Sequence, residues 1–196
     1  MTRIIGGDAG GRRLATPRGQ HTRPTSDRVR EALFSTMEAW CGTLRGLRFL
    51  DLYAGSGAVG LEAWSRGAGV VTLVESDRRT AALIADNARS LGFARAHVVA
   101  APVSVVLGRA PSAPYDLVFA DPPYPLDDDA VAADLAALDA QGWLVPEALV
   151  VVERSTRSPK PRWPVGFTDV RARKYGETTL WFGHAAPGDE TTDQQE

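Results

Sequence analysis

From Leu47 onward the sequence alternates between short apolar runs and helical patterns, and no other feature constrains the fold of this chain as strongly. The apolar runs are typical of buried strands and cover residues 49–52, 70–75, 97–99, 115–120 and 148–152. The helical patterns lie between them and cover residues 59–66, 78–91, 103–107 and 129–138. Strands that alternate with helices build a parallel sheet with helices on both faces. The sequence therefore predicts an α/β fold.

The last part of the chain has a different pattern. Residues 165–173 and 178–182 have the composition of two strands, joined by a turn at Tyr175-Gly176. Strands joined by a short turn pair in the antiparallel sense. We therefore expect a seven-stranded, mostly parallel sheet that ends in an antiparallel pair.

The residues before Leu47 predict a small extension of this fold. Arg3-Ile4-Ile5 and Arg12-Arg13-Leu14 flank a glycine-rich turn and indicate a β-hairpin. Ser26 or Asp27 can then cap a helix with a single apolar stripe. The stripe consists of Val29, Leu33, Phe34, Met37 and Trp40. These patterns divide the chain into a basic hairpin-and-helix extension (1–46), an α/β domain (47–184) and a disordered acidic tail (185–196).

Composition limits the class of protein. The chain has 196 residues, of which 44% are hydrophobic, and this is enough for one domain with a substantial core. No apolar run approaches the roughly 20 residues of a membrane helix, and the first residues lack the apolar stretch of a signal peptide. The single cysteine, Cys41, excludes an internal disulfide and a cysteine-based zinc site. We expect a soluble, cytoplasmic monomer that binds neither a membrane nor a metal.

A glycine-rich loop follows the first strand of the α/β domain. Gly55-Ser56-Gly57-Ala58-Val59-Gly60 separates that strand from a helix, and glycines in this position let the backbone approach a ligand at the helix N-terminus. Glu75 ends the next strand, 20 residues after Gly55, where its carboxylate can accept both hydroxyl protons of a ribose. The loop therefore indicates a nucleotide site.

Because the same glycine spacing is found in NAD-binding proteins, Asp51 decides which nucleotide fits. It lies four residues before Gly55, and we expect its side chain to point into the same crevice. A carboxylate there repels a pyrophosphate but attracts an ammonium or a sulfonium group. S-adenosylmethionine carries both of these cations, a ribose for Glu75 and no phosphate. The charge pattern therefore favours S-adenosylmethionine over NAD.

Asp121-Pro122-Pro123-Tyr124 forms a second motif. It follows the strand 115–120 and so lies at the same carboxyl edge of the sheet as the glycine loop. The two prolines fix the backbone and remove N–H donors, which leaves carbonyl oxygens free beside the Asp121 carboxylate. This rigid set of acceptors, next to the flat ring of Tyr124, suits a planar base that carries an exocyclic NH2 group.

The net charge of −2 hides two basic segments. Residues 1–30 hold seven arginines and two acids, and residues 154–174 hold seven bases and one acid. Such segments fit contact with phosphates, but they also occur on solvated surfaces, and charge alone does not decide between the two.

The two motifs together resemble those of class I S-adenosylmethionine-dependent methyltransferases that modify amino nitrogens. The glycine motif reads Asp51-Leu52-Tyr53-Ala54-Gly55-Ser56-Gly57. The segments Arg23-Pro24-Thr25-Ser26-Asp27-Arg28-Val29-Arg30-Glu31-Ala32-Leu33-Phe34 and Lys174-Tyr175-Gly176-Glu177-Thr178 narrow the resemblance to the RsmD family. That family methylates the N2 amine of one guanine in 16S ribosomal RNA. The resemblance covers about residues 3–182 and implies a Rossmann-like fold, S-adenosylmethionine as cofactor and 16S rRNA in a 30S assembly particle as the partner.

The motifs and the resemblance assign roles to three groups of residues. The catalytic group is Asp121, Pro122, Pro123 and Tyr124. The cofactor-binding group is Asp51, Tyr53, Ala54, Gly55, Ser56, Gly57, Glu75 and Ser76. The RNA-binding group is Arg3, Arg12, Arg13, Arg23, Arg28, Arg30 and Lys174, although some of these arginines can instead brace the cofactor site. Ala100-Ala101-Pro102 follows the third strand, so backbone groups are left to recognise the adenine. We expect direct methyl transfer to a flipped base.

Three other functions stay open. A DNA adenine-N6 methyltransferase could use the same Asp-Pro-Pro-Tyr cluster, although the chain leaves no room for a separate DNA-reading domain. A protein-glutamine methyltransferase would have no use for the basic segments. A catalytically silent RNA-binding protein of the same fold would not need Asp51 and Asp121.

Overall fold

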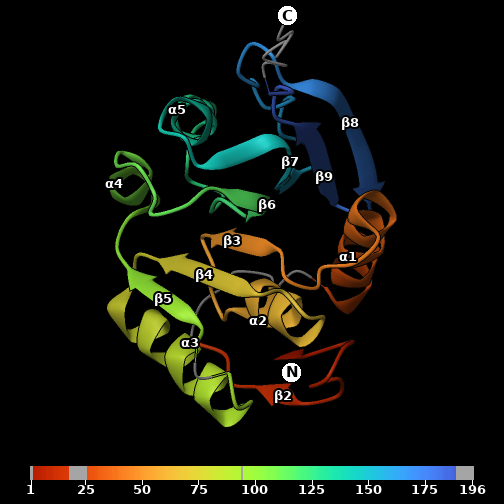
Figure 1. Cartoon of the computed structure of the whole chain (residues 1–196), viewed down its shortest axis with the longest axis vertical. Helices are drawn as coiled ribbons and strands as arrows, with labels where there is room; N and C mark the ends of the chain where they lie inside the picture. The colour runs from red at the N-terminus through yellow and green to blue at the C-terminus, as the bar shows by residue number, and fades with distance from the viewer. Residues whose placement is uncertain (1, 18–25, 94, 189–196) are drawn as a thin grey trace, which may run out of the picture.

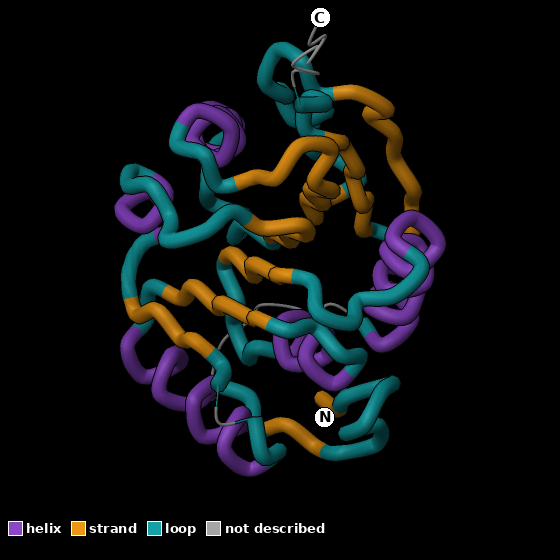
Figure 2. Tube along the Cα trace, viewed as in Figure 1, coloured by secondary structure: helices purple, strands orange, loops and turns teal. Residues whose placement is uncertain are grey.

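The computed structural model describes residues 2–17, 26–93 and 95–188. The main sheet has seven strands in the order β5-β4-β3-β6-β7-β9-β8 (Figures 1 and 2). These strands are β3 (Arg48–Leu52), β4 (Val70–Glu75), β5 (His97–Ala100), β6 (Tyr115–Ala120), β7 (Leu144–Ser155), β8 (Thr168–Tyr175) and β9 (Thr178–His184). Strands β3 to β7 are parallel, whereas β9 is antiparallel to both β7 and β8. The predicted α/β fold with its antiparallel end is confirmed.

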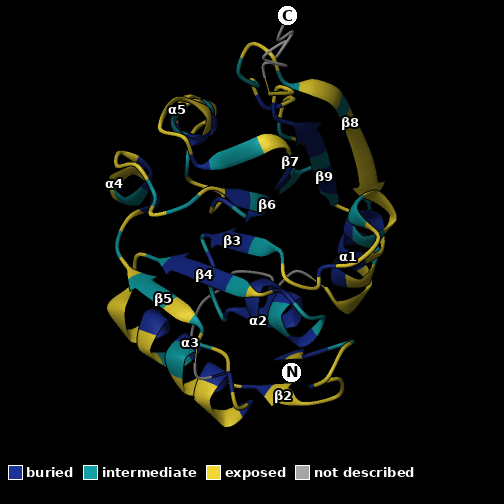
Figure 3. Cartoon of the chain, viewed as in Figure 1, coloured by how far each residue is buried: buried dark blue, intermediate teal, exposed yellow. Residues whose placement is uncertain are grey.

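Helices cover both faces of this sheet. They are α1 (Asp27–Cys41), α2 (Ala58–Ser65), α3 (Arg78–Ser90), α4 (Val103–Leu107) and α5 (Asp128–Ala140). Helices α1, α2 and α3 pack on one face, around Phe34, Leu61 and Ile84. Helices α4 and α5 pack on the other face, around Leu107 and Leu135. Burial is greatest in the central strands and in the helix faces turned towards them (Figure 3).

The hairpin predicted before Leu47 is present, and it is docked on α2. Its strands β1 (Thr2–Arg3) and β2 (Arg13–Leu14) pair in the antiparallel sense. The fully buried Glu62 of α2 accepts the backbone N–H groups of Ile5 and Gly6, both at 2.8 Å. A Cβ on Gly7 would meet the Ser65 carbonyl oxygen at 1.9 Å, so only glycine allows this approach. The hairpin is therefore attached to the α/β layers rather than extended into solvent.

Helix α1 belongs to the same core. The Ser26 side chain caps it by accepting the N–H of Val29, as one of the two predicted caps. Leu33 and Met37 are fully buried against the sheet, but Trp40, predicted as part of the apolar stripe, is 36% exposed. It lies at the last turn, where the helix passes the edge of the sheet.

Two strand boundaries differ from the sequence pattern. β8 begins at Thr168 rather than at residue 165, because Phe167 donates to the Pro164 carbonyl in a turn and Val165 is fully exposed. β7 extends beyond the apolar run 148–152 at both ends, because Leu144 pairs with Tyr115 of β6 and Ser155 pairs with Thr178 of β9.

The sheet has one carboxyl edge at which the predicted motifs meet. Ala54 after β3 donates to the Val74 carbonyl of β4 at 2.9 Å, and Asp121 after β6 donates to the Leu52 carbonyl of β3 at 3.3 Å. Tyr175 pairs with Thr178, which pairs with Ser155, so the ends of β7 and β8 lie at this edge as well.

In the part of the chain that the structure describes, no helix has the length and apolar character needed to span a membrane.

Candidate active site

The glycine loop turns the chain sharply from β3 into α2. Gly55 and Gly57 have φ angles of 55° and 77°, in the left-handed region that favours glycine. A Cβ on Gly57 would lie 2.8 Å from Ile84 Cγ2, and one on Gly60 would lie 2.6 Å from Leu73 Cδ2. By contrast, a Cβ on Gly55 would meet nothing within 4 Å. Gly57 and Gly60 therefore allow close packing, whereas the space beside Gly55 is open to a ligand.

Glu75 lies against this loop at the end of β4. Its Oε2 accepts the Gly55 N–H at 2.9 Å, and its Oε1 accepts the Asp77 N–H at 2.9 Å. Each carboxylate oxygen has a second lone pair, so both hydroxyl groups of a ribose can still bind there. Ser76, the next residue, is exposed beside it. This geometry fits the predicted ribose-binding role.

The sequence predicts that the Asp51 side chain points into the crevice, but in the structure this side chain is buried beneath the glycine loop. Its side chain is 1% exposed, and its Oδ2 accepts the Gly60 N–H at 2.8 Å in the first turn of α2. Burial raises the pKa of this carboxyl to about 7, and the neighbouring charge of Glu75 adds to the rise. Asp51 thus acts on the crevice from beneath, by fixing the loop and by its charge.

Asp121 begins the second motif, next to β3. Burial raises the pKa of its carboxyl well above the usual range, and the charges of Glu153 and Asp51 contribute, while Arg154 opposes the rise. Pro122 is buried, Pro123 is exposed and the Tyr124 ring is 71% exposed. The motif thus combines a fixed, partly buried acceptor with an open aromatic ring.

The crevice is acidic as a whole. Asp51, Glu75, Asp121 and Glu153 all lie at the carboxyl ends of adjacent strands, and the raised pKa values of Asp51 and Asp121 arise in part from this crowding. A cation entering the crevice would favour the ionised forms, whereas a diphosphate would meet repulsion. The electrostatic preference inferred from Asp51 therefore rests on several carboxyl groups together.

Three polar residues that the sequence did not single out support the two motifs. Asp134 of α5 is the first of these residues and accepts a hydrogen bond from the Tyr53 hydroxyl. Burial raises the pKa of both groups, and the hydrogen bond adds to the rise for Tyr53 but opposes it for Asp134. Arg154 of β7 binds Asp128 at 2.9 Å and the Leu126 carbonyl at 3.5 Å, which fixes the loop after Tyr124. These partners are 26 to 81 residues apart in sequence, so no local pattern indicates them.

Asn87 of α3 is the third of these residues and is 4% exposed. Its Oδ1 accepts the Ala15 N–H, and its Nδ2 donates to the Ala15 carbonyl, both at 2.9 Å. The same Nδ2 donates to the Ser56 carbonyl at 3.3 Å. Asn87 thus connects the glycine loop to the chain that leaves the hairpin.

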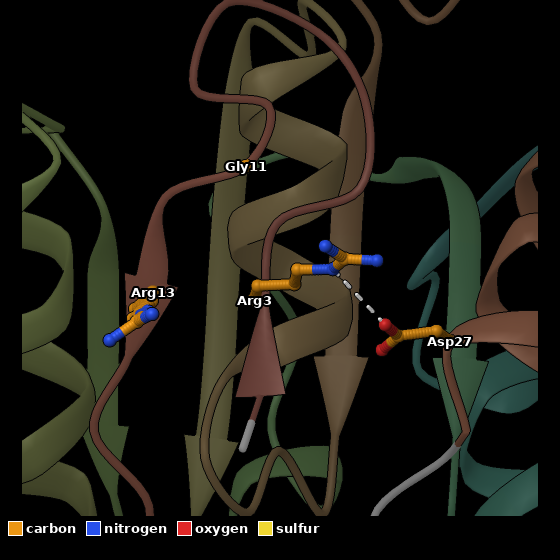
Figure 4. Close-up of a pocket in the computed structure, with 4 residues that line it drawn as sticks. All are labelled: Arg3, Gly11, Arg13 and Asp27. Atoms are coloured by element: carbon orange, nitrogen blue, oxygen red, sulfur yellow. Dashed lines mark hydrogen bonds and ion pairs between the residues drawn. The ribbon is translucent and has the colours of Figure 1, made fainter.

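The predicted RNA-binding residues fall into different environments. Arg3 and Arg13 line a groove on the hairpin together with Gly11 and Asp27, and Arg3 Nε lies 3.3 Å from Asp27 Oδ2 (Figure 4). The remaining exposed members are Arg12, Arg28 and Lys174, and Arg12 donates to the Ser90 carbonyl. Arg23 lies outside the described residues.

Arg30 is not placed for contact with RNA. Its side chain is fully buried, and its Nη2 donates to Asp27 Oδ1 at 2.8 Å and to the Arg3 carbonyl at 2.6 Å. Burial lowers the pKa of the guanidinium. In the structure, Arg30 therefore braces the start of α1 against the hairpin, and its side-chain bonds are to neither of the two motifs.

Within the described ranges, no three or more His, Cys, Asp or Glu residues gather in a group that could hold a metal ion.

A seven-stranded sheet with this strand order and an antiparallel end is the fold of class I methyltransferases, and open α/β sheets bind ligands at the carboxyl edge where the two motifs meet. Residues 2–184 match the family described as conserved hypothetical protein 95. The chain belongs to this family, which is the RsmD family.

Relatives of the chain agree with this assignment. The chain is 36% identical over 175 residues to ribosomal RNA small subunit methyltransferase D of Escherichia coli K12, covering 89% of this chain and 85% of the relative. It is also 36% identical over 162 residues to the protein of the same name from Haemophilus influenzae, covering 81% and 80% of the two chains. A solved structure titled "Putative methyltransferase yhhF from Escherichia coli" superposes with a TM-score of 0.84 at 32% identity, covering 95% of this chain and 99% of the other.

Proposed function

We propose that this protein transfers the methyl group of S-adenosylmethionine to the exocyclic N2 amine of a guanine in 16S rRNA, within a 30S assembly particle. One observation carries the proposal. The glycine loop, where Glu75 accepts the Gly55 N–H, and the Asp121-Pro122-Pro123-Tyr124 turn lie at the same acidic edge of the sheet. The names of the relatives support ribosomal RNA as the substrate class. The choice of guanine N2 follows from the resemblance of the motifs to the RsmD family.

The residues of the crevice fit the cofactor. The open space beside Gly55 leaves room for a ligand next to the Glu75 carboxylate, which can accept the ribose hydroxyls. The four carboxyl groups favour a ligand with positive charge and no phosphate. When bound, S-adenosylmethionine supplies an electrophilic methyl group.

The second motif activates the amine of the target base. Tyr124 offers its exposed ring for stacking, which can contribute roughly 1–3 kcal/mol towards the flipping of the base out of its stack. The N2 hydrogens donate to the Asp121 carboxylate and to the Pro122 carbonyl. These bonds stabilise the positive charge that develops on nitrogen as the N–C bond forms and the C–S bond breaks. The extra proton then leaves the nitrogen for Asp121 or water.

Alignment of the target amine with the methyl group contributes further to the rate of methyl transfer. Two prolines and the bonds of Arg154 hold the turn, so the amine approaches along a fixed line. Proximity and orientation of this kind can be worth roughly 7–11 kcal/mol. Neither Cys41 nor a histidine lies in the two motifs, so the residues present support direct transfer without a covalent adduct.

The experiment that tests this function follows tritiated methyl transfer from S-adenosylmethionine to bare 16S rRNA, small-subunit particles and DNA. We expect more transfer to the small-subunit particles than to bare rRNA, with the label on guanine N2. Asp121→Ala should abolish transfer while calorimetry with S-adenosylhomocysteine shows nearly unchanged affinity. Asp139→Asn, an exposed acid at the far end of α5, is the matched control. Transfer to DNA alone, or near-normal turnover of Asp121→Ala, would contradict the proposal.

A further inference from the structure

Helix α1 lies beside β8 (Figure 1). Residues of these two elements, together with His184 at the end of β9, line a polar groove. Its lining includes Thr36, Trp40, Asp169, Arg171, Arg173 and His184. His184 pairs with Leu149 near the amino end of the β7 apolar run, six residues along β9 from Thr178 at the carboxyl edge. At about 3.3 Å per residue, the two ends of β9 lie about 20 Å apart. The end of the groove at His184 is therefore separate from the candidate active site, whereas Arg173 lies two residues from Tyr175 at the carboxyl edge.

Backbone strain is concentrated beneath this groove. Among the described non-glycine residues, only Tyr53, Glu147 and Asp169 have a positive φ. Tyr53 belongs to the glycine loop, whereas the other two both face His184: its Nδ1 donates to the Glu147 carbonyl at 3.2 Å, and its Nε2 lies 3.9 Å from Asp169 Oδ2. Such conformations cost roughly 1–3 kcal/mol each and cluster at functional sites. The surrounding structure therefore holds the backbone of Glu147 and Asp169, below the groove, in an unfavourable conformation.

The groove also presents an aromatic ring. Large aromatic side chains are exposed at two positions in the described part of the chain, Tyr124 at the active site and Trp40 here. The Trp40 ring lies 5.3 Å from the His184 ring, at an angle of 43°, and is thus supported from one side. An exposed and supported aromatic ring is a platform on which an unpaired base can stack.

Two guanidinium groups flank this ring. Arg173 Nη1 donates to Thr36 Oγ1 at 3.4 Å, and Arg171 Nη1 lies 3.5 Å from Asp169 Oδ2. Each of these contacts engages one nitrogen, while a guanidinium has five N–H donors. Both groups can therefore bind a phosphate without giving up their present contacts.

The position of these arginines also accounts for the second basic segment of the sequence. Of its bases, Arg154 and Arg162 pair with Asp128 and Asp129 at the start of α5. Arg171 and Arg173 instead lie side by side along β8 on the face turned towards α1, because side chains two residues apart share a face of a strand. Four of the seven bases of the segment thus belong either to ion pairs with α5 or to the groove.

We propose that this groove binds a single-stranded segment of the RNA substrate, with one base stacked on Trp40 and the adjacent phosphates on Arg171 and Arg173. This inference rests on the proposed function, because it assigns a second contact to the same substrate. The combination of ring and cations fits a nucleotide better than an acidic peptide, which would use the cations alone.

The test measures binding of a fluorescein-labelled, single-stranded oligouridylate and of bare 16S rRNA at several salt concentrations. We expect Trp40→Ala to weaken oligouridylate binding about tenfold and Trp40→Phe to retain most of it. Arg171→Gln together with Arg173→Gln should lower the slope of log K against log salt by about 1.4, since each phosphate contact on a single strand contributes about 0.7. Arg157→Gln, an exposed base of the same segment outside the groove lining, is the control. At saturating RNA, kcat of methyl transfer should not change.

The possible outcomes distinguish a failure of the groove proposal from a failure of the proposed function. If the wild-type protein methylates RNA but all groove variants bind oligouridylate with unchanged affinity and salt slope, the groove proposal is wrong and the proposed function stands. If the variants lose affinity only for protein-containing particles and not for RNA, the groove binds a protein and the proposal is again wrong. If the wild-type protein neither binds nor methylates RNA, both proposals fail.

Discussion

Asp51 lies buried beneath the candidate active site rather than on its surface. Its carboxylate is buried beneath the glycine loop and accepts the N–H of Gly60, so it holds the first turn of α2. The same burial makes its ionisation costly. An acid whose pKa is higher in the folded than in the unfolded state destabilises the fold as pH rises through the interval between the two values.

This cost gives a pH-dependent prediction for Asp51→Asn, which retains an oxygen to accept the Gly60 N–H. The folded carboxyl has a pKa of about 7 and the unfolded one about 4, so the folded protein holds the extra proton between these values. From pH 5 to pH 8, the free energy of unfolding of the variant should rise by about 2–3 kcal/mol relative to the wild type. Urea unfolding at both pH values measures this. A difference that does not change with pH would show that Asp51 is not buried in this way.

At the scale of elements, α3 connects the glycine loop to the hairpin. Asn87 binds the backbone of Ala15 and the Ser56 carbonyl, and Arg12 donates to the Ser90 carbonyl at the end of the same helix. A ligand that orders the glycine loop therefore acts on a helix that also holds the exit of the hairpin. Binding at the two parts should be thermodynamically coupled, and such coupling is reciprocal.

The prediction concerns Asn87→Asp, which keeps the acceptor for the Ala15 N–H but loses both donors. We expect S-adenosylhomocysteine and 16S rRNA to strengthen each other's binding in the wild type and to do so less in the variant. The loss of bonds to a buried site should also lower the free energy of unfolding by about 1–3 kcal/mol. Calorimetry with and without RNA measures the coupling. Asp86→Asn, at an exposed neighbouring position, serves as control, and equal coupling in all three proteins would contradict the role of Asn87.

At the scale of the whole molecule, the hairpin contributes both charge and stability. Ile4 and Leu14 are buried in the core that α1, α2 and α3 share, and Glu62 is satisfied by hairpin N–H groups. Deletion of the hairpin would uncover this core and leave a buried carboxylate without those donors, which is strongly destabilising. Truncation is therefore a poor probe of RNA contact, and point substitutions are needed.

We expect Arg3→Gln together with Arg13→Gln to weaken binding to 16S rRNA and to reduce its salt dependence, with little change in Tm. Each lost phosphate contact should lower the slope of log K against log salt by about 0.7–0.9. Removal of residues 1–17 should instead lower Tm by many degrees. If the double substitution leaves affinity and slope unchanged at several salt concentrations, the hairpin groove does not bind RNA.

The strands and helices could be predicted because the information lies within each segment. The nearly continuous apolar runs in 70–75 and 115–120 reflect burial on both faces of a parallel sheet, and the structure confirms both strands. The glycine loop could be placed as well, since a strand, a turn and a helix follow each other directly.

The supporting contacts could not be predicted, because they join residues far apart in sequence. Asn87 lies 72 residues from Ala15, and Glu62 lies 57 residues from Ile5. The basic segment 1–30 predicts that Arg30 contacts RNA, yet its bonds to Asp27 and to the Arg3 carbonyl hold it inside the fold. The direction of the Asp51 side chain likewise depends on the packing of α2, which no local pattern specifies.

Helix α2 has only eight residues, and each of its ends holds a different part of the molecule. Its first turn is fixed to Asp51 under the crevice, and its last turn, through Glu62 and Ser65, carries the hairpin. Each residue of an α-helix advances the chain by 100°. Surface loops elsewhere can lengthen freely, but one residue inserted here would rotate the crevice and the hairpin out of phase with each other. Over this stretch, the length of the chain is as strictly constrained as the identity of its residues.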